Sequence, residues 1–542
     1  MASTSGPGPS DPADDERANY DYAGEEVERP GLVADLRDLV SGEVRFDTYT
    51  RQLYATDASA YEVTPIGVVF PTGTEDVAAV VSHCADREIP VLPRGGGTSL
   101  AGQTVNEAVV LDFTRHMDDV RAVDPDERLA TAGPGVRLGD LNAELEPHGL
   151  KFAPDPAWGD KSALGGAIGN NSTGSHSLKY GKTDAYVEEV EAVLADGTVT
   201  TLGETGLEEV RAEADPDADA LLPRVYAEVA RIVDEEATEV DRRYPSLKRN
   251  VSGYNLDVLV EEARRANDPE DERETVNLAR LLAGSEGTLA VVTEATVSLE
   301  PVPNTKAVAM LTYGGLVEAM EDVTAILEHD PAAVEVLDDV LLDLARDTPE
   351  FADVVGMLPE DAESVLLVEF YAETDDEGRR KVADLVADRC PGVETEFEPT
   401  EGATERSGEP RRATAALEAH DAEKRARFWK MRKAGNPILL SRTSDAKHIS
   451  FVEDTAVPAE NLPEFVAEYR EVLADHDTFA AYYGHAGPGV LHIRPLVNTK
   501  TVEGVETLES IADDVTDLAV KYGGSVSGEH GDGRARTQWN RK

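Results

Sequence analysis

The sequence predicts an α+β fold of more than one domain. Short apolar segments typical of strands alternate with segments of helical periodicity from about Val63 onward. The prolines Pro301 and Pro303 mark a change in this pattern, and we take them as a domain boundary. The chain has 542 residues, of which 41% are hydrophobic, so it is long enough to bury two or three substantial cores.

The N-terminal region predicts a tail, a strand and a helix, in that order. Residues 1–30 are rich in Pro, Gly, Asp and Glu and predict a disordered acidic tail. Residues 68–70 (VVF) predict a strand. Residues 72–76 (TGTED) carry the hydroxyl and the acids that favour a helix start, and valines follow at helical spacing at positions 77, 80 and 81.

A glycine-rich loop, residues 94–102 (RGGGTSLAG), lies between two predicted strands, residues 89–92 and 109–112. Three successive glycines can adopt backbone conformations closed to other residues, so their N–H groups can converge on an anion. The loop lacks the GxxxxGK[ST] and GxGxxG spacings of the two common nucleotide-binding loops. It predicts a diphosphate cradle, with an ordinary flexible turn as the alternative.

The next elements are a hairpin and a group of helices. Residues 190–202 predict a hairpin whose turn is the Asp-Gly pair at 196 and 197. Residues 207–240 are charged and predict helices that are broken by Pro216 and Pro223.

Beyond the proline pair the pattern again alternates. Residues 365–370 predict a strand and residues 378–387 a helix. An amphipathic helix is predicted from about Leu508 to Tyr522, and Gly523 ends it as a C-terminal capping glycine.

The charge of the chain is strongly negative and spread from end to end. The chain has 107 Asp and Glu against 51 Lys and Arg, a formal net charge of −56. Such a surface repels itself in dilute buffer and is typical of halophilic proteins. It excludes a nucleic-acid partner, because phosphates would be repelled.

Cysteine content and hydropathy exclude further classes. Only Cys84 and Cys390 are present, too few for a disulfide framework or for the four thiolates of an iron–sulfur cluster. No stretch approaches the length of a membrane span, and the start of the chain is polar, unlike a signal sequence. We therefore expect a cytoplasmic protein, with any cluster located elsewhere.

Three small-residue segments resemble the flavin domain of the vanillyl-alcohol oxidase or PCMH superfamily. They are residues 94–102, residues 165–175 (GGAIGNNSTGS) and residues 284–293 (GSEGTLAVVT). Residues 54–61, 429–432 (WKMR), 484–492 (GHAGPGVLH) and 523–531 (GGSVSGEHG) resemble the FAD-linked D-2-hydroxy-acid dehydrogenases. That group includes D-lactate dehydrogenase, the glycolate oxidase flavin subunit and D-2-hydroxyglutarate dehydrogenase, and the likeness runs from about Arg51 to the last residue.

The resemblance implies a division of the chain. A PCMH-type FAD-binding domain of two subdomains would occupy residues 31–300, and a substrate or cap domain with an antiparallel sheet residues 301–510. Residues 511–542 would return with the Gly-Glu-His-Gly motif. In the most similar relatives the flavin part is fused to a cysteine-rich iron–sulfur part, so we expect the native chain to continue past Lys542.

The resemblance also implies which residues bind FAD. The diphosphate would be wrapped by the first glycine loop, the rest of the cofactor lined by the second segment, and its adenine and ribose end reached by the third. Thr98 stands where covalent relatives commonly have the attaching His, so noncovalent FAD is expected. The residues implied are Arg94, Gly95, Gly96, Gly97, Thr98, Ser99, Pro154, Asp155, Gly165, Gly166, Asn170, Gly174, Ser175, Glu286, Gly287, Val291 and Val292. Each has an ordinary turn or packing role as its alternative.

His485, His492 and Glu529 form a candidate metal site. Two histidines seven residues apart do not share a face of one strand, but the intervening Gly-Pro-Gly breaks the strand, so that both imidazoles can turn to one point. Two nitrogens and one oxygen suit zinc or another divalent transition ion. In the family these positions ligate a metal. His530 follows directly and could remove the proton of a metal-bound α-hydroxyl.

Four further residues are candidates for holding the substrate. Arg432 matches the family position for a bidentate contact with the substrate carboxylate, and Lys447 matches a second basic position. Asn436 stands where relatives tend to have a hydroxyl residue. Arg494 stands where many relatives have Asn, and it would either read a second substrate carboxylate or pair with an acid of the protein.

The motifs together predict oxidation of a D-2-hydroxy acid, of the D-lactate or D-2-hydroxyglutarate type, by hydride transfer to flavin N5. Electrons would pass to an iron–sulfur domain or subunit, or to a quinone-linked carrier that could hold the protein at a membrane. The alternatives are a glycolate oxidase-type subunit, a flavin oxidase of alcohols or sugars, and a noncatalytic electron-transfer or scaffold subunit. The metal candidates together with Arg432 argue against the last two.

Overall fold

The computed structural model describes residues 29–349, 351, 355–390, 392–403, 410–433, 435–440 and 442–542. The predicted acidic tail lies outside these residues up to position 28. Its last residue, Pro30, already belongs to the first described helix, α2 (Pro30–Leu39). Among the described residues, no helix has both the length and the apolar character needed to cross a bilayer.

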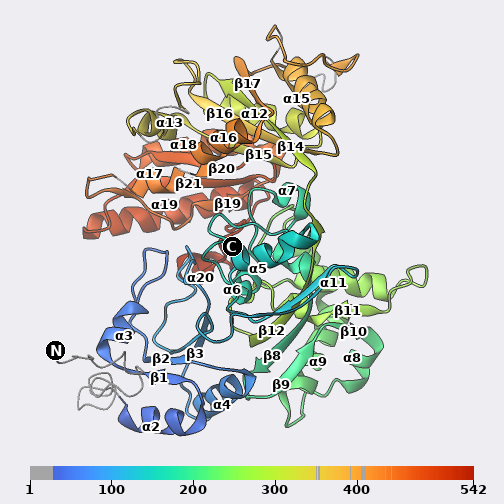
Figure 1. Ribbon diagram of the computed structural model, residues 1–542. Helices are drawn as coiled ribbons and strands as arrows, with labels where there is room; N and C mark the ends of the chain where they lie inside the picture. The colour runs from blue at the N-terminus through green and yellow to red at the C-terminus, as the bar shows by residue number, and fades with distance from the viewer. Residues whose placement is uncertain are drawn as a thin grey trace, which may run out of the picture.

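The first domain (residues 29–301) begins with a four-stranded sheet at the bottom of Figure 1. The strands predicted at residues 68–70, 89–92 and 109–112 are confirmed. The strand at 109–112 lies between the other two and pairs in parallel with each of them. Apolar side chains of α2 and α4 pack against the sheet, and α3 lies beside it. The strands, in spatial order, are β1 (Glu43–Arg45), β2 (Gly67–Phe70), β4 (Val109–Asp112) and β3 (Val91–Arg94), and the helices are α3 (Thr48–Leu53) and α4 (Thr74–Ala85).

A five-stranded antiparallel sheet forms the second half of the first domain. The predicted hairpin is confirmed as β8 and β9, and Gly197 lies at φ +86° in its turn. A shared core joins the sheet to α5 and α6. The elements are β5 (Val120–Asp124), β6 (Leu129–Ala132), β12 (Ala290–Ser298), β8 (Val187–Leu194), β9 (Val199–Leu202), α5 (Leu138–Leu145), β7 (Leu150–Lys151), α6 (Leu164–Asn170) and α7 (Ser177–Tyr180).

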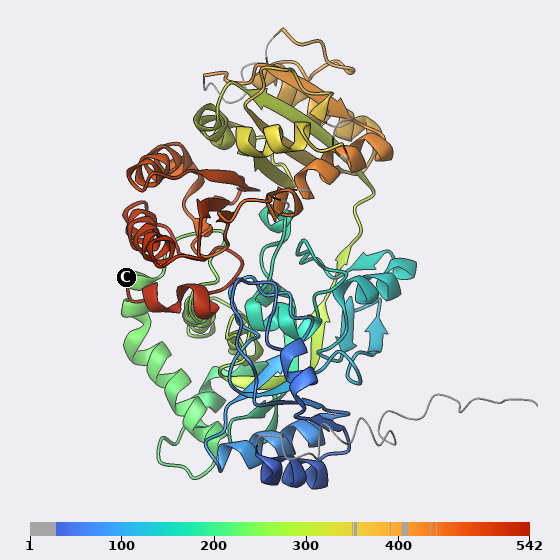
Figure 2. The same cartoon turned by 90° about the vertical axis from the view of Figure 1, so that its left-hand side faces the viewer.

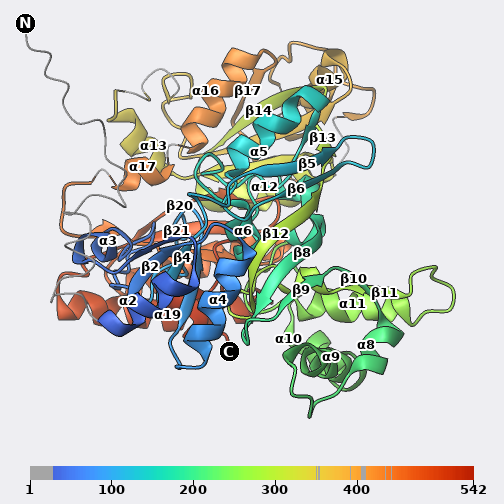
Figure 3. The ribbon, with the colours of Figure 1, turned by 60° about the horizontal axis from the view of Figure 1, so that its bottom comes forward.

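The predicted charged helices lie to one side of this sheet (Figure 3). Pro223 does not break a helix as predicted, because it sits in the first turn of α9, where its missing N–H is tolerated. The break lies between α8 and α9. The elements are β10 (Glu204–Gly206), α8 (Leu207–Glu213), α9 (Leu221–Arg231), a π-helical turn (Ile232–Glu236), α10 (Ala237–Arg243), α11 (Leu256–Ala266) and β11 (Thr275–Asn277).

The cap domain (residues 305–521) is an eight-stranded antiparallel sheet at the top of Figure 1. Along the sheet the order is β17-β14-β16-β15-β20-β21-β18, and β19 also pairs with β21. The strands are β14 (Thr305–Tyr313), β15 (Ala333–Leu337), β16 (Ser364–Ala372), β17 (Ala415–Ala419), β18 (Lys447–His448), β19 (Asp454–Ala456), β20 (Ala480–His485) and β21 (Val490–Val497).

Helices cover both faces of this sheet and bury two separate cores. One core holds residues of α12, α15, α18 and α19, and the other holds residues of α13, α16 and α17. The helices are α12 (Leu316–Leu327), α13 (Asp339–Arg346), α15 (Asp375–Arg389), α16 (Ala422–Lys433), α17 (Gly435–Leu440), α18 (Leu462–Asp475) and α19 (Val502–Lys521).

Helix α19 corrects two expectations. It begins at Val502 rather than near Leu508, because the side chain of Thr501 caps it by accepting a hydrogen bond from the Gly504 N–H at 3.1 Å. The expected division at residue 510 therefore falls inside a helix that packs against α18 and β21. Its predicted end is confirmed, since Gly523 follows at φ +69°.

The C-terminal segment (residues 522–542) leaves the cap domain and returns to the first domain. Figure 2 shows this red segment beside the green helices. In its short helix α20 (Gly533–Arg536), the Arg534 N–H donates to the Ala101 carbonyl at 2.8 Å. Asp532 accepts from the Gly253 N–H at 2.8 Å. The segment thus brings residues 529 and 530 between the two domains.

Candidate functional site

The first glycine loop packs directly against residues 161–166, which lead into the second small-residue segment. A Cβ at Gly96 would lie 1.9 Å from the Lys161 carbonyl oxygen, and one at Gly95 would lie 2.7 Å from Ala163 Cβ. Gly97 has φ +65°, which favours glycine. A Cβ at Gly166, in the facing first turn of α6, would meet no atom within 4 Å. The two segments therefore form a close-walled cradle with one open side, which fits a diphosphate.

The side chains of this loop hold its backbone in place. The Arg94 guanidinium donates to the carbonyl oxygens of Tyr54, Thr104 and Thr56, at 3.2, 3.0 and 2.8 Å. The hydroxyls of Thr98 and Ser162 lie 3.1 Å apart, and Ser99 donates to Gln103 at 2.7 Å. Arg94 therefore ties the loop to the backbone of residues 54–56 and of residue 104.

The third segment ties the C-terminal segment to the first domain. Glu286, at φ +54°, accepts hydrogen bonds from the N–H groups of Asp532 and Gly533 at 2.7 and 3.0 Å. Gln103 donates to both Glu286 and Asn170 at 2.8 Å. Asn170 in turn donates to the Glu529 carbonyl at 2.8 Å. Sequence reasoning missed Gln103, although this residue directly follows the first glycine loop.

The other predicted cofactor residues occupy three settings. Val291 and Val292 pack against apolar cores from strand β12, and Gly287 follows Glu286 with φ +74°. Gly165 and Gly174 are closely packed, since a Cβ would lie 2.7 Å from Pro134 Cβ and 2.0 Å from the Asp155 carbonyl. Pro154, Asp155 and Ser175 lie between β7 and α7, where the Asp155 carboxylate pairs with His176 Nδ1.

His485, His492 and Glu529 converge on one point. His485 ends β20, and His492 lies on β21, where it pairs with Tyr483 across the hairpin. The predicted break of the strand is confirmed, since Gly489 has φ +81° and its N–H donates to the Ala486 carbonyl. The Nε2 atoms of His485 and His492 lie 3.2 and 2.9 Å from Glu529 Oε1.

This donor set fits a divalent cation. Glu335 accepts at 2.7 Å from His485 Nδ1, which directs the lone pair of Nε2 toward Glu529. Two imidazole nitrogens and a carboxylate oxygen at one buried point match the ligands of zinc. Burial opposes the charge on His485, but Glu335 and Glu529 outweigh it and raise its pKa.

Glu529 has a second buried partner that sequence reasoning missed. The fully buried guanidinium of Arg249 forms an ion pair with Glu529 Oε2. Burial raises the pKa of Glu529, but Arg249 and then His485 outweigh it and hold that pKa well below its ordinary value. Glu529 is therefore a carboxylate, the form that binds metals.

Two adjacent acids, Glu453 and Asp454, support the Gly-Glu-His-Gly motif. Asp454 Oδ2 accepts from the N–H groups of Glu529 and His530 at 2.9 and 2.7 Å. Glu453 Oε1 lies 3.0 Å from His530 Nδ1, which leaves Nε2 facing Glu529 Oε1 at 3.2 Å. Burial lowers the pKa of His530, but the two acids raise it to about 10. The sequence signal that could have identified Glu453 and Asp454 is their position as an acidic pair within the largely apolar segment at residues 451–457.

The four predicted substrate residues lie in different surroundings. Arg432 Nε donates to Glu335 at 2.5 Å, so it reaches the partner of His485. Arg494 is buried 5.8 Å from the ring of Tyr483, and although burial lowers its pKa, Tyr483 and Glu453 raise it. Lys447 donates to the Arg442 carbonyl. Asn436 belongs to α17, but its side chain lies outside the described part of the structure.

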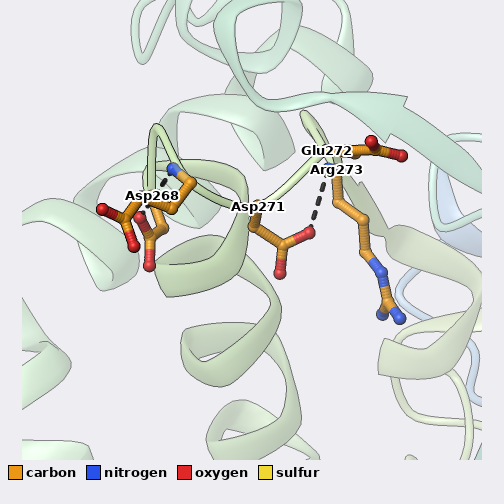
Figure 4. A pocket seen from close by; sticks show the side chains of 5 residues that line it. Asp268, Asp271, Glu272 and Arg273 are labelled. Carbon is orange, nitrogen blue, oxygen red and sulfur yellow. Dashed lines mark hydrogen bonds between the residues drawn. The ribbon is translucent and has the colours of Figure 1, made fainter.

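The hollow in Figure 4 is separate from this site. It lies on the loop between α11 and β11, and four acids and one arginine line it: Asp268, Glu270, Asp271, Glu272 and Arg273. Two of these side chains accept hydrogen bonds from backbone of the same loop, Asp268 from the Glu270 N–H at 2.9 Å and Asp271 from the Arg273 N–H at 3.1 Å. The hollow offers no histidine, cysteine or glycine cradle.

Two protein-family models match the chain. The FAD binding domain matches residues 65–203, and the C-terminal domain of FAD linked oxidases matches residues 302–542. The first match contains two of the three small-residue segments. The second contains the three metal candidates.

Curated relatives carry three kinds of name. D-2-hydroxyglutarate dehydrogenase of Pseudomonas putida is 31% identical over 499 residues, which are 91% of this chain and 47% of the relative. The glycolate oxidase subunit GlcD of Bacillus subtilis is 27% identical, over 92% of this chain and 88% of the relative. The D-lactate dehydrogenase of Archaeoglobus fulgidus is 28% identical, over 86% and 83%. The chain thus spans about half the length of the D-2-hydroxyglutarate dehydrogenases that it matches.

Solved structures share the fold. An alkyldihydroxyacetonephosphate synthase superposes with a TM-score of 0.60 at 18% identity, over 92% of this chain and 80% of the other. A p-cresol methylhydroxylase with substrate bound gives a TM-score of 0.63 at 13% identity, over 93% and 91%. The predicted fold class, a PCMH-type FAD-binding domain with an antiparallel cap domain, is confirmed.

Proposed function

We propose that this chain, which matches both the FAD binding domain and the C-terminal domain of FAD linked oxidases, oxidises a D-2-hydroxy acid to the 2-oxo acid in a metal-dependent reaction. The observation that carries this proposal is the convergence of His485, His492 and Glu529 where the C-terminal segment meets the first domain. A scaffold or electron-transfer subunit would have no need of these ligands.

FAD would be held noncovalently by the glycine cradle. Residues 95–99 and the facing residues 161–166 would contact the diphosphate, because their backbones are closely apposed and the glycines at 95–97, 165 and 166 have no side chain to cover their N–H groups. Arg94 and Glu286 would act by fixing these loops. Bound FAD supplies the acceptor for the hydride that leaves the α-carbon.

The metal would be held by His485, His492 and Glu529. A bound divalent cation supplies positive charge that makes the substrate hydroxyl more acidic. Glu335 fixes the ring of His485, and Arg249 keeps Glu529 ionised, so the ligand set is preorganised.

The substrate would be positioned and deprotonated by residues of the cap domain and the C-terminal segment. Glu453 accepts the Nδ1 hydrogen of His530. Positive charge bound at the adjacent metal site would offset the two acids and favour the neutral ring, and His530 Nε2 would then accept the proton of the α-hydroxyl. Arg432 would bind the carboxylate, with Lys447 and Asn436 as further contacts.

The preferred substrate is a dicarboxylic acid such as D-2-hydroxyglutarate, the compound that names the relatives at 30% and 31% identity. Arg494 would bind the second carboxylate of this substrate. D-Lactate is the second candidate, because Arg494 lies in the field of Glu453 and Tyr483 and so has partners within the protein. Glycolate is a third, since the GlcD relative is matched over 88% of its length.

We also propose that electrons leave through an iron–sulfur domain or subunit or a quinone-linked carrier. The two cysteines of the chain are buried, and neither is in a disulfide. They are too few for a cluster, which takes four thiolates.

Anaerobic bleaching of the flavin tests the proposal. The protein in molar KCl is mixed with D-2-hydroxyglutarate, D-lactate or glycolate, and flavin absorbance is followed. His485→Ala should keep FAD but lose bleaching. His476→Ala, which removes a histidine paired with Asp514, is the matched control and should bleach normally. Full bleaching in His485→Ala, or after thorough chelation, would rule out the metal role.

A further inference from the structure

We propose that Glu335 is a positioning residue that couples the substrate-binding Arg432 to the metal ligand His485. The inference rests on the proposed function, because both partners take their roles from it. Nothing in the sequence around residue 335 singles out this acid, which lies in the apolar run AVEVL of strand β15.

The strand register places Glu335 at the junction. Glu335 on β15 is the direct cross-strand partner of His485 on β20. Its side chain points to the face of the sheet that α16 covers, and α16 carries Arg432. With 1% of its surface exposed, Glu335 is a carboxylate that only its protein partners stabilise.

Each oxygen of this carboxylate has one hydrogen-bond partner within the part of the chain that the structure describes. Oε1 accepts from His485 Nδ1 at 2.7 Å, and Oε2 accepts from Arg432 Nε at 2.5 Å. Burial raises the pKa of Glu335, but His485 and Arg432 outweigh it and hold that pKa below its ordinary value. A rotation of the carboxylate therefore moves the imidazole and the guanidinium together.

His485 is the better anchored of the two histidine ligands. The equivalent atom of His492, Nδ1, is 3.7 Å from Glu453 Oε2, beyond hydrogen-bond distance, and has no hydrogen-bond partner among the described residues. Loss of the Glu335 charge should therefore release the better anchored of the two ligand rings. It should also free Arg432 from the contact that orients it.

The experiment compares zinc and carboxylate binding in full-length variants kept in molar KCl. Zinc affinity is measured with Zn²⁺ alone against a competing chelator, and 2-oxoglutarate affinity by the change in flavin absorbance. The test variant is Glu335→Gln. The matched control is Glu418→Gln, which removes another buried carboxylate that pairs with a histidine, His420, at 2.7 Å on β17 of the same sheet.

In Glu335→Gln we expect the zinc dissociation constant to rise about 10- to 100-fold. The affinity for 2-oxoglutarate should also fall, while FAD content stays at the wild-type level. Glu418→Gln should change neither affinity. Glu335→Asp keeps the charge but is one methylene shorter, so it should lose less zinc affinity than Glu335→Gln.

Zinc affinity equal to wild type in folded Glu335→Gln overturns the inference. If that variant does not fold, Glu335→Asp decides by the same measurement, and unchanged affinities for both zinc and 2-oxoglutarate overturn it. A loss of 2-oxoglutarate binding alone also overturns the coupling, since Glu335 would then serve only Arg432. Wild-type protein that binds no zinc would instead remove the metal from the proposed function.

Discussion

His176 is the titratable group through which the contact between the two domains should respond to pH. It belongs to the first domain, and its Nδ1 pairs with Asp155 of the same domain. Its Nε2 lies 2.7 Å from Glu369 Oε1 on β16 of the cap domain, and Trp429 donates to the other Glu369 oxygen at 2.7 Å. The perturbation we consider is a rise from pH 6 to pH 10, with and without the substitution His176→Gln.

The magnitude follows from the pKa of His176. Burial lowers this pKa, but Asp155 and Glu369 outweigh it and raise it from 6.5 to about 9. A rise of the His176 pKa from 6.5 to about 9 corresponds to about 3.4 kcal/mol of folding free energy at most. Because the pKa is higher in the folded state, this stability is fully present below about pH 6.5 and is lost as the pH rises through about 9. It is about 3 kcal/mol at pH 6 and close to zero at pH 10.

Urea unfolding in 2 M KCl measures this contribution. Molar salt screens the exposed charges, whereas the pair of His176 with Glu369, whose side chains are 11% and 2% exposed, is screened much less. The free energy of unfolding should differ between wild type and His176→Gln by about 3 kcal/mol more at pH 6 than at pH 10. Asp338, whose pKa burial raises to about 8, titrates in the same window in both proteins and cancels in the comparison. Equal pH dependence in the two proteins would refute the reasoning.

Three further predictions concern the cofactor, the surface and the substrate. Acid or heat should release FAD into the filtrate, because Thr98 stands in place of an attaching histidine; flavin that stays with the polypeptide would contradict this. The unfolding temperature should rise steeply between 0.1 and 3 M KCl, because a formal charge of −56 must be screened and the Debye length at 1 M is about 3 Å; a flat response would remove the halophilic interpretation. Arg494→Ala should lower kcat/KM for D-2-hydroxyglutarate, about tenfold per 1.4 kcal/mol, and leave D-lactate turnover nearly unchanged. Equal losses on both acids would mean that Arg494 pairs with Glu453, or that it serves the α-hydroxy-acid chemistry that both substrates share.

Local features of the chain were readable from the sequence alone. The glycine triplet, the Asp-Gly turn of the β8–β9 hairpin and the Gly-Pro-Gly turn between His485 and His492 depend on the backbone freedom of a few neighbouring residues. The start of helix α19 could not be predicted in this way. Its first turn exposes Val502 and Val505, by 76% and 49%, so the buried apolar face begins only later and periodicity misses the true start.

Only the tertiary structure decided how the site is supported. Glu335 lies 150 residues from His485, and Arg249 lies 280 residues from Glu529, so no local pattern joins either pair. In the sequence, Glu335 and Arg249 cannot be told apart from ordinary surface charges. What distinguishes them is burial beside an opposite charge, and burial depends on how the cap sheet, the first domain and the returning C-terminal segment pack together.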